Sequence, residues 1–219
     1  MSTPTTPGPV RLAGLCGSLR NGSLNAAVLA TAADLCGPSA TMSIHPGLDR
    51  LPYFSHDIEM DCPPPPVVEF RELLSGADAV LITSPEYAHG TSGMLKNALE
   101  WSVGSGDLVG KPVAVVTASP SFTGGDRAQA WVRETLEVMG AVLLPPLMIA
   151  SAGPQFRDGR VQDEAILNDL RSVIAQLAEA AHEAQSPVES TPALALDKSS
   201  DIADRLERPS TRLTVKKQQ

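Results

Sequence analysis

The chain has 219 residues, of which 42% are apolar and 19% are charged. This is the composition of a globular protein, and it excludes a chain that is disordered throughout. A length of this size predicts one or two domains. The formal net charge of −8 argues against a general nucleic-acid binder, because phosphate backbones recruit clustered basic side chains.

Short apolar runs alternate with longer helical patterns along most of the chain. In chain order we expect a strand over 10–17, a helix over 23–36, a strand over 40–45, a proline-rich loop over 51–66, a helix over 67–74, a strand over 77–83, a helix over 93–101, a strand over 112–117, a helix over 127–139, a strand over 141–149 and a helix over 164–184. Two of these strands, ADAVLIT and PVAVVT, are almost wholly apolar, as a parallel sheet covered on both faces requires.

This alternation predicts an α/β fold with right-handed βαβ units. Five strands and five helices fit a flavodoxin-like, doubly wound parallel sheet with strand order 2-1-3-4-5. We expect a single domain over 10–185, preceded by a flexible arm over 1–9. The remaining segment, 186–219, contains no aromatic residue and no glycine, which predicts a disordered tail; the alternative is a segment that docks onto a partner or is swapped between subunits.

The cysteines and histidines do not predict a metal site or a disulfide framework. Cys16, Cys36 and Cys62 show no CxxC spacing, and the four histidines are far apart. No apolar run approaches the ~20 residues of a membrane span, and the N-terminus lacks the pattern of a signal peptide. We therefore expect a cytoplasmic protein that binds neither membranes nor nucleic acid.

Ligands of doubly wound sheets bind beyond the carboxyl ends of the strands, so the loops there are the candidate site. The loop after the first predicted strand reads GSLRNGSLN and opens a helix. Its backbone N–H groups, its serines and Arg20 would suit a phosphate. The alternative is a Gly/Ser turn that only caps the helix.

Two further loops should lie at the same edge of the sheet. SPEYAHGTSG offers Tyr87 as a planar face, and an acid–base pair of Glu86 and His89 is a weaker reading of the same loop. SPSFTGGDR offers Gly124 and Gly125, which let a backbone approach a ligand closely. Arg127 stands in the first turn of a helix, where a cation is disfavoured, so we expect it to have an anionic partner.

Together the three loops predict a mononucleotide site. The sequence offers no convincing nucleophile, triad or metal cluster, so we assign no catalytic side chain and expect a bound cofactor to carry the chemistry.

At this point the motifs resemble a known family, the NADPH-dependent FMN reductases. GSLRNGSLN resembles the family's phosphate loop GSLRxxSxN, and SPEYAHGTSGMLKNALEW resembles its SPEYxxxxPGxLKNAxDW segment. TASPSFTGGDRAQ resembles its third loop. The resemblance implies a flavodoxin-like reductase with FMN as cofactor and NADPH or NADH as hydride donor.

The resemblance also implies site residues, position by position. The FMN phosphate and the start of the ribityl chain would be held by Ser18, Arg20, Ser23, Leu24 and Asn25. The isoalloxazine would be lined by Pro85, Glu86, Tyr87 and Ala88, with Ser119, Gly124 and Gly125 closing the other side. A pocket for a 2′-phosphate has three candidate cations, Arg50, Lys111 and Arg127.

Three departures from the family's pattern bear on substrate choice. Ser92 replaces a proline, which we expect to loosen the start of the following helix. Ala88 replaces a common asparagine. Phe122 adds bulk to the third loop, where we expect it either to narrow the nicotinamide side or to shape a pocket for the acceptor.

We therefore expect an NAD(P)H-dependent FMN oxidoreductase that passes electrons to a small-molecule acceptor: free flavin for a partner monooxygenase, a quinone, an azo compound or a similar molecule. The resemblance further implies a homodimer or homotetramer. The alternative is a non-enzymatic flavin-binding electron carrier or interaction module.

Overall fold

The computed structural model describes residues 8–185. The predicted tail and residues 1–7 of the predicted arm lie outside the described residues. The helices are α1 (Leu24–Leu35), α2 (His56–Asp61), α3 (Pro65–Gly76), α4 (Gly93–Val103), α5 (Asp126–Val138) and α6 (Glu164–Gln185), with a short 3-10 turn η1 (Leu48–Arg50). The strands are β1 (Val10–Cys16), β2 (Ala40–Ile44), β3 (Ala79–Ser84), β4 (Pro112–Ala118), β5 (Val142–Leu143), β6 (Leu147–Ile149), β7 (Phe156–Arg157) and β8 (Arg160–Val161).

The main sheet is parallel and has the order β2-β1-β3-β4-β5, with β6 also paired to β4. This confirms the predicted flavodoxin-like α/β topology. The central strands β3 and β4 are buried along their whole length, which is why their sequences are continuously apolar.

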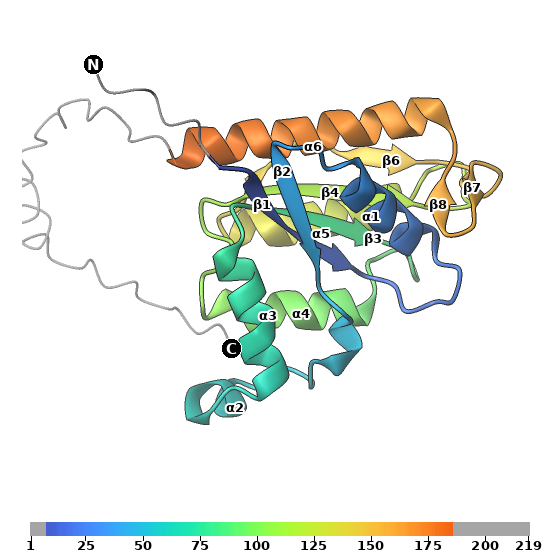
Figure 1. Cartoon of the computed structure of the whole chain (residues 1–219). Helices are drawn as coiled ribbons and strands as arrows, with labels where there is room; N and C mark the ends of the chain where they lie inside the picture. Colours follow the sequence, from blue (N-terminus) through green and yellow to red (C-terminus); the bar gives the residue numbers. More distant parts are fainter. Residues whose placement is uncertain (1–7, 186–219) are drawn as a thin grey trace, which may run out of the picture. The chain divides into compact units, whose positions relative to one another are not determined.

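Helices cover both faces of this sheet (Figure 1). One core cluster joins α1 and α6 to one face, and the other joins α3, α4 and α5 to the opposite face. Neighbouring strand residues alternate between the two clusters, so Leu81 packs on the first and Val80 and Ile82 on the second. With both faces of the sheet covered by described helices, a ligand of the sheet itself is expected at the ends of the strands.

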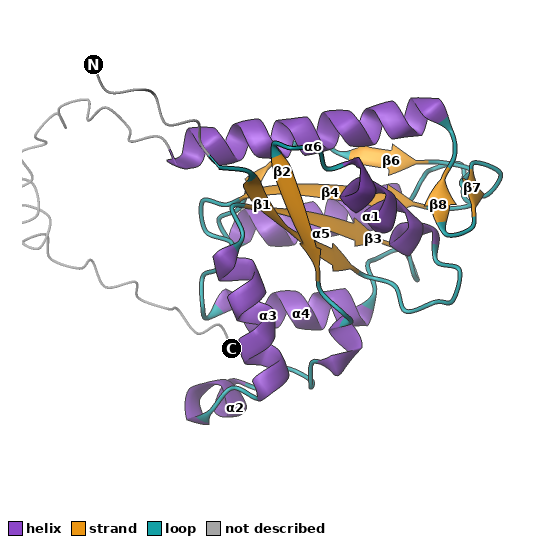
Figure 2. Cartoon of the chain, viewed as in Figure 1, coloured by secondary structure: helices purple, strands orange, loops and turns teal. Residues whose placement is uncertain are grey.

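The prediction of a loop over 51–66 is wrong. The segment contains α2 and the first two residues of α3 (Figure 2). Pro65 begins α3 because a proline at the first helical position loses no hydrogen bond. No residue of α2 is buried, and polar contacts hold this helix: Glu59 forms an ion pair with Arg71, which also donates to the Trp101 carbonyl.

The single strand predicted over 141–149 is divided into β5 and β6. Val142 of β5 pairs with Pro112 of β4, and Leu147 of β6 pairs with Val116 of β4. Between these two pairs, the segment that contains β5 and β6 has one more residue than β4. The extra residue falls at Pro145 and Pro146, which cannot donate to the ladder. The hairpin of β7 and β8 was not predicted.

The described residues offer neither a membrane span nor a metal-binding cluster. Within residues 8–185, no helix is long and apolar enough to cross a membrane, and no group of three or more His, Cys, Asp or Glu residues could hold a metal ion. Cys16, Cys36 and Cys62 are free thiols.

Candidate functional site

The loops after β1, β3 and β4 meet at the carboxyl edge of the sheet. They line one small cavity of about 70 Å³, which includes nine of the twelve predicted site residues. The nine are Ser18, Arg20, Ser23, Leu24, Asn25, Pro85, Glu86, Tyr87 and Ser119. Ala118 and Pro120 also line it and were not predicted, whereas Ala88, Gly124 and Gly125 do not line it. The cavity is smaller than the ~300–1,000 Å³ of pockets that enclose a ligand, so a mononucleotide would lie largely across its mouth.

The loop after β1 presents free donors to this cavity. Ser23 caps α1 by accepting a hydrogen bond from the Ala26 N–H at 3.2 Å, and its hydroxyl proton remains available. Among the described residues, no acceptor is found for the N–H groups of Leu24 and Asn25, which belong to the first turn of α1. The Arg20 side chain is exposed and has no ion-pair partner in this part of the chain. This is the arrangement that an anion at a helix N-terminus needs.

Asn25 plays a structural part in the same loop. Its Nδ2 donates to the Ala118 carbonyl at 3.0 Å, and its Oδ1 accepts from the Ala118 N–H at 3.0 Å. The side chain is buried and joins the first turn of α1 to the last residue of β4. Since both ends of the amide are engaged, Asn25 positions the phosphate loop against the loop after β4.

The loop after β3 forms a tight turn that displays Tyr87. Tyr87 and Gly90 exchange two backbone hydrogen bonds of 2.9 Å, and the two residues between them, Ala88 and His89, have φ angles of 49° and 61°. Asparagine tolerates this left-handed region better than alanine, so Ala88 holds a backbone conformation that its side chain disfavours. The Tyr87 side chain is half exposed.

Glu86 connects this loop to α5. Its Oε2 accepts from the N–H groups of Arg127 and Ala128 at 3.2 and 3.4 Å, so the carboxylate caps the N-terminus of α5. Its Oε1 lies 3.5 Å from Nδ1 of His89. The structure therefore brings Glu86 and His89 together, but half of the carboxylate is committed to the helix.

The loop after β4 contains two left-handed glycines. Gly124 and Gly125 have φ angles of 68° and 87°. A Cβ on Gly124 would lie 3.1 Å from the Ala150 nitrogen, and one on Gly125 would lie 3.2 Å from Cβ of Thr117. The two glycines thus permit a close approach of the chain to itself as well as the turn. Phe122, at the tip, is 87% exposed.

Ser92 does not loosen the start of α4, contrary to the expectation. Its hydroxyl accepts from the Leu95 N–H at 3.2 Å and caps the helix.

The three candidate cations for a 2′-phosphate lie in different surroundings. Lys111 precedes β4, at the opposite end of the strand from the loops, and its Nζ donates to the Leu74 carbonyl. Burial lowers its pKa. Nη2 of Arg50 lies 3.3 Å from Oε2 of Glu69, so this cation already has an anionic partner. Arg127 is at the site edge and its exposed side chain has no partner within residues 8–185, so the anionic protein partner expected for it is not found there.

The site has no activated nucleophile among its nearest groups. Cys16 ends β1 directly below the loop, and burial raises the pKa of its thiol, whose Sγ lies 3.5 Å from the Ser18 carbonyl. The arrangement is therefore suited to binding and positioning a phosphorylated, planar molecule.

Comparison with known proteins agrees with this geometry. The family of NADPH-dependent FMN reductases matches residues 10–155. An NAD(P)H-dependent FMN reductase of Pseudomonas aeruginosa is 36% identical over 160 residues, which are 71% of this chain and 86% of that protein. An NAD(P)H:quinone oxidoreductase of Solanum tuberosum is 36% identical over 77% of this chain and 91% of its own length. A quinone reductase of Escherichia coli is 33% identical over 68% of this chain and 78% of that protein.

Solved structures show the same fold. The flavoenzyme NAD(P)H:(acceptor) oxidoreductase FerB of Paracoccus denitrificans superposes with a TM-score of 0.70 and 27% identity, over 80% of this chain and 98% of that chain. A flavodoxin of Pseudomonas aeruginosa superposes with a TM-score of 0.51 and 17% identity, over 78% of this chain and 99% of that chain, which is a likeness of fold alone.

Proposed function

This chain belongs to the family of NADPH-dependent FMN reductases, and on that premise we propose that it holds FMN across the loops after β1, β3 and β4 and passes electrons from NAD(P)H to a quinone-type acceptor. The chain is an oxidoreductase with FMN and NAD(P)H as its cofactors. The relatives named as reductases favour this enzyme over a non-enzymatic electron carrier.

The observation that carries the proposal is the open N-terminus of α1. Within residues 8–185, the free N–H groups of Leu24 and Asn25, the hydroxyls of Ser18 and Ser23 and the unpaired cation of Arg20 form a donor set. The carboxylate that lines the same cavity, that of Glu86, is bonded to the N-terminus of α5. The N-terminus of α5 differs, because Glu86 already occupies it. An FMN phosphate therefore fits at α1 rather than at α5.

The other two loops would hold the ring. Pro85 is buried and fixes the direction of the chain after β3, so the half-exposed Tyr87 is left as a face for the isoalloxazine. Ser119 would border the ring from the far side, and the Gly124–Gly125 turn sets the course of that loop behind it. Ala88, which lies outside the small cavity, would contact the ring at its open side.

When bound, FMN supplies two-electron chemistry between NAD(P)H and a second substrate. The chain's own residues bind and orient. Neither Glu86 nor His89 is assigned proton transfer, since the Glu86 carboxylate serves the N-terminus of α5.

Among the acceptors that the motifs allow, we propose a quinone, because two of the relatives above are named for quinones. The supply of reduced flavin to a partner monooxygenase and the reduction of azo compounds are the alternatives. Tight retention of FMN with fast quinone turnover supports the first; ready release of the flavin after reduction supports the supply role.

The first experiment is an absorbance spectrum of the FMN-loaded protein before and after anaerobic addition of NADPH and of NADH. Bleaching of the flavin absorbance is expected. An unchanged flavin spectrum with both nucleotides would overturn the enzymatic proposal. The same solution, given a quinone, should regain its absorbance.

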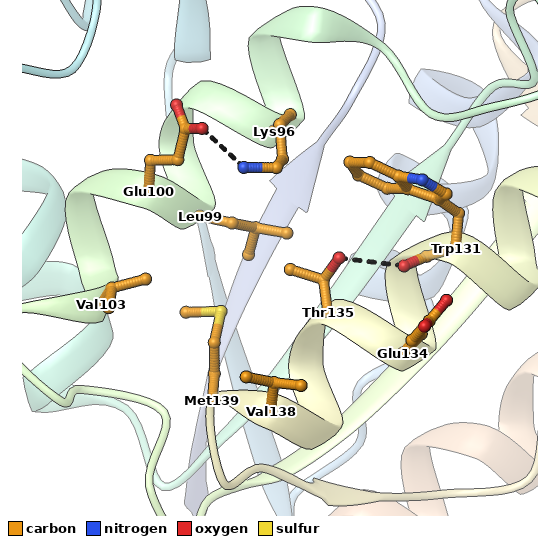
Figure 3. A pocket seen from close by; sticks show the side chains of 9 residues that line it. All are labelled: Lys96, Leu99, Glu100, Val103, Trp131, Glu134, Thr135, Val138 and Met139. Atoms are coloured by element: carbon orange, nitrogen blue, oxygen red, sulfur yellow. Dashed lines mark hydrogen bonds and ion pairs between the residues drawn. The ribbon is translucent and has the colours of Figure 1, made fainter. Parts of the chain in front are cut away.

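We further propose that the chain forms a homodimer or homotetramer through the groove between α4 and α5. Figure 3 shows this cavity of about 380 Å³, with apolar side chains from both helices facing each other and the Lys96–Glu100 ion pair at its border. Trp131 is 38% exposed and Val138 is 88% exposed. Exposure of apolar side chains to water is unfavourable, so covering them with a second copy of the chain would be favourable. Light scattering should give an oligomer for the unmodified chain and a smaller species for Val138→Arg. A monomer in both would contradict this assignment.

A cytoplasmic location is also part of the proposal, and the three free thiols suit a reducing compartment.

A further inference from the structure

Two buried polar atoms next to the proposed FMN site have no bonding partner within residues 8–185. They are the hydroxyl of Thr117, one residue before the end of β4, and the amide oxygen Oε1 of Gln129, in the first turn of α5. Thr117 is 0% exposed and Gln129 is 3% exposed. Nearly all buried polar groups of native proteins bond to protein atoms or to ordered water, because an unsatisfied group destabilises the fold. A bonding partner is therefore expected at this place.

Both atoms lie between β4 and the start of α5. The side chain of Thr117 faces α5, since Val113 and Val115, at alternate positions of the same strand, belong to the core cluster on that face. Gln129 Nε2 donates to the Val115 carbonyl at 2.8 Å, and the Gln129 N–H donates to the Gly125 carbonyl at 3.0 Å. Gly125 in turn lies against Thr117, because a Cβ built on it would be 3.4 Å from Oγ1. The two atoms thus flank the same turn of α5.

The two atoms are also chemically complementary. The Val115 carbonyl can only accept, so the amide nitrogen of Gln129 must face it and Oε1 faces away. Oε1 is an acceptor and the Thr117 hydroxyl is a donor, yet the two do not bond to each other directly. A water molecule can accept from the hydroxyl and donate to the amide oxygen, and buried waters are held by two to four such groups. Because residue 125 is a glycine, no side chain of that residue fills the space beside the hydroxyl.

From this arrangement we infer that one internal water molecule binds between Thr117 Oγ1 and Gln129 Oε1 and that Thr117 is thereby a positioning residue of the FMN site. The water ties the end of β4 to the first turn of α5. That turn offers the N–H groups that Glu86 caps, and it follows directly on Gly125, so the loops after β3 and β4 share this support. The effect on FMN rests on the proposed function, whereas the water site itself does not.

Thr117→Val tests the water site through stability, on the full chain with and without saturating FMN. Valine has the shape of threonine, with a methyl group in place of the hydroxyl. Loss of the hydroxyl deprives the water of a partner and leaves Gln129 Oε1 unsatisfied, so we expect the Tm to fall by about 2–6 °C. A hydroxyl that is truly without a partner gives the opposite sign, because its removal relieves the fold.

Thr31→Val is the matched reference for a buried threonine whose hydroxyl is satisfied. The Thr31 hydroxyl donates to the Ala27 carbonyl at 2.8 Å and accepts from the Val161 N–H at 3.0 Å, so the Tm of this variant should also fall. A Tm that rises in Thr117→Val while it falls in Thr31→Val overturns the inference.

A crystal structure of the full chain tests the site directly. We expect a water molecule within hydrogen-bonding distance of both Thr117 Oγ1 and Gln129 Oε1, and its loss in Thr117→Val. A direct hydrogen bond between the two side chains, with no water between them, would overturn the inference even if the Tm falls.

A fluorescence titration of the flavin tests the positioning role. Thr117→Val should weaken FMN binding about threefold or more, whereas Thr117→Ser keeps the hydroxyl and should bind FMN as the unmodified chain does. Thr31→Val loses stability on the other face of the sheet and should leave FMN affinity unchanged. Unchanged FMN affinity in Thr117→Val overturns the positioning role. If the unmodified chain binds no FMN, the proposed function is refuted, and the Tm and the crystal structure still decide the water site.

Discussion

Among residues 8–185, Arg20 is the one cation that lines the proposed phosphate cavity, and its side chain is exposed. A hydrogen bond to a charged group contributes about 1.5–3 kcal/mol. We predict that Arg20→Ala weakens FMN binding by this amount, roughly 10- to 150-fold, in a fluorescence titration of the flavin. Arg50→Ala is the control, since Arg50 already faces Glu69. An unaltered FMN affinity in Arg20→Ala would contradict the placement of the FMN phosphate at the N-terminus of α1.

Gly125 gives a second prediction for a single residue, concerning stability. Gly125→Ala must keep a φ of 87° and place its Cβ 3.2 Å from Thr117. Gly110→Ala must keep a φ of 69° but meets no atom within 4 Å. We expect Gly110→Ala to lower the free energy of unfolding by about 1 kcal/mol and Gly125→Ala by about 2–4 kcal/mol, because crowding adds to the backbone strain. Equal losses in urea titrations would show that the crowding is relieved.

The connection of the β3 loop to α5 is a property of two elements, and Glu86 makes it. Glu86→Gln keeps an acceptor oxygen for the helix, so we predict nearly normal turnover and a small loss of stability. Glu86→Ala loses the cap, at about 0.5–2 kcal/mol. Urea unfolding and steady-state assays of both variants decide the matter. A ~1000-fold drop in turnover for Glu86→Gln, within the range of a lost general acid or base, would assign Glu86 a proton-transfer role instead.

At the scale of elements, the sequence predicted what periodicity and local motifs encode. The buried strands and the helix cap at Ser23 are local patterns, so β3, β4 and α1 could be placed from them. The helix α2 has no buried face and is held by Glu59 and Arg71 across the chain, which no periodicity signals.

The same distinction holds for the candidate site. The glycine- and serine-rich loops could be located from their positions after strands. The Asn25–Ala118 pair joins residues 93 positions apart, and the capping of α5 by Glu86 joins positions 41 apart. Long-range polar contacts of this kind depend on the packed sheet, and the sequence alone does not show them.

For the whole molecule, the proposed chemistry lies at one edge of the sheet and a stabilising ion pair at the other. Arg11 in β1 donates to Asp78 at 2.8 Å, and this bond holds the pKa of Asp78 below its ordinary value of 3.8. Because the folded pKa is lowered, the stabilisation is present above about pH 4 and is lost as the pH falls through the folded pKa. We predict that Asp78→Asn lowers the Tm by about 2–4 °C at pH 7 and pH 5, and that the difference shrinks as the pH falls below about 4. FMN affinity should not change, since the edge of the sheet that carries the proposed FMN site is not touched.

Asp57→Asn, on exposed α2 and without a bonding partner among the described residues, serves as the control. A Tm difference that does not shrink at all as the pH falls below about 4 would show that Asp78 acts by packing and not by its charge.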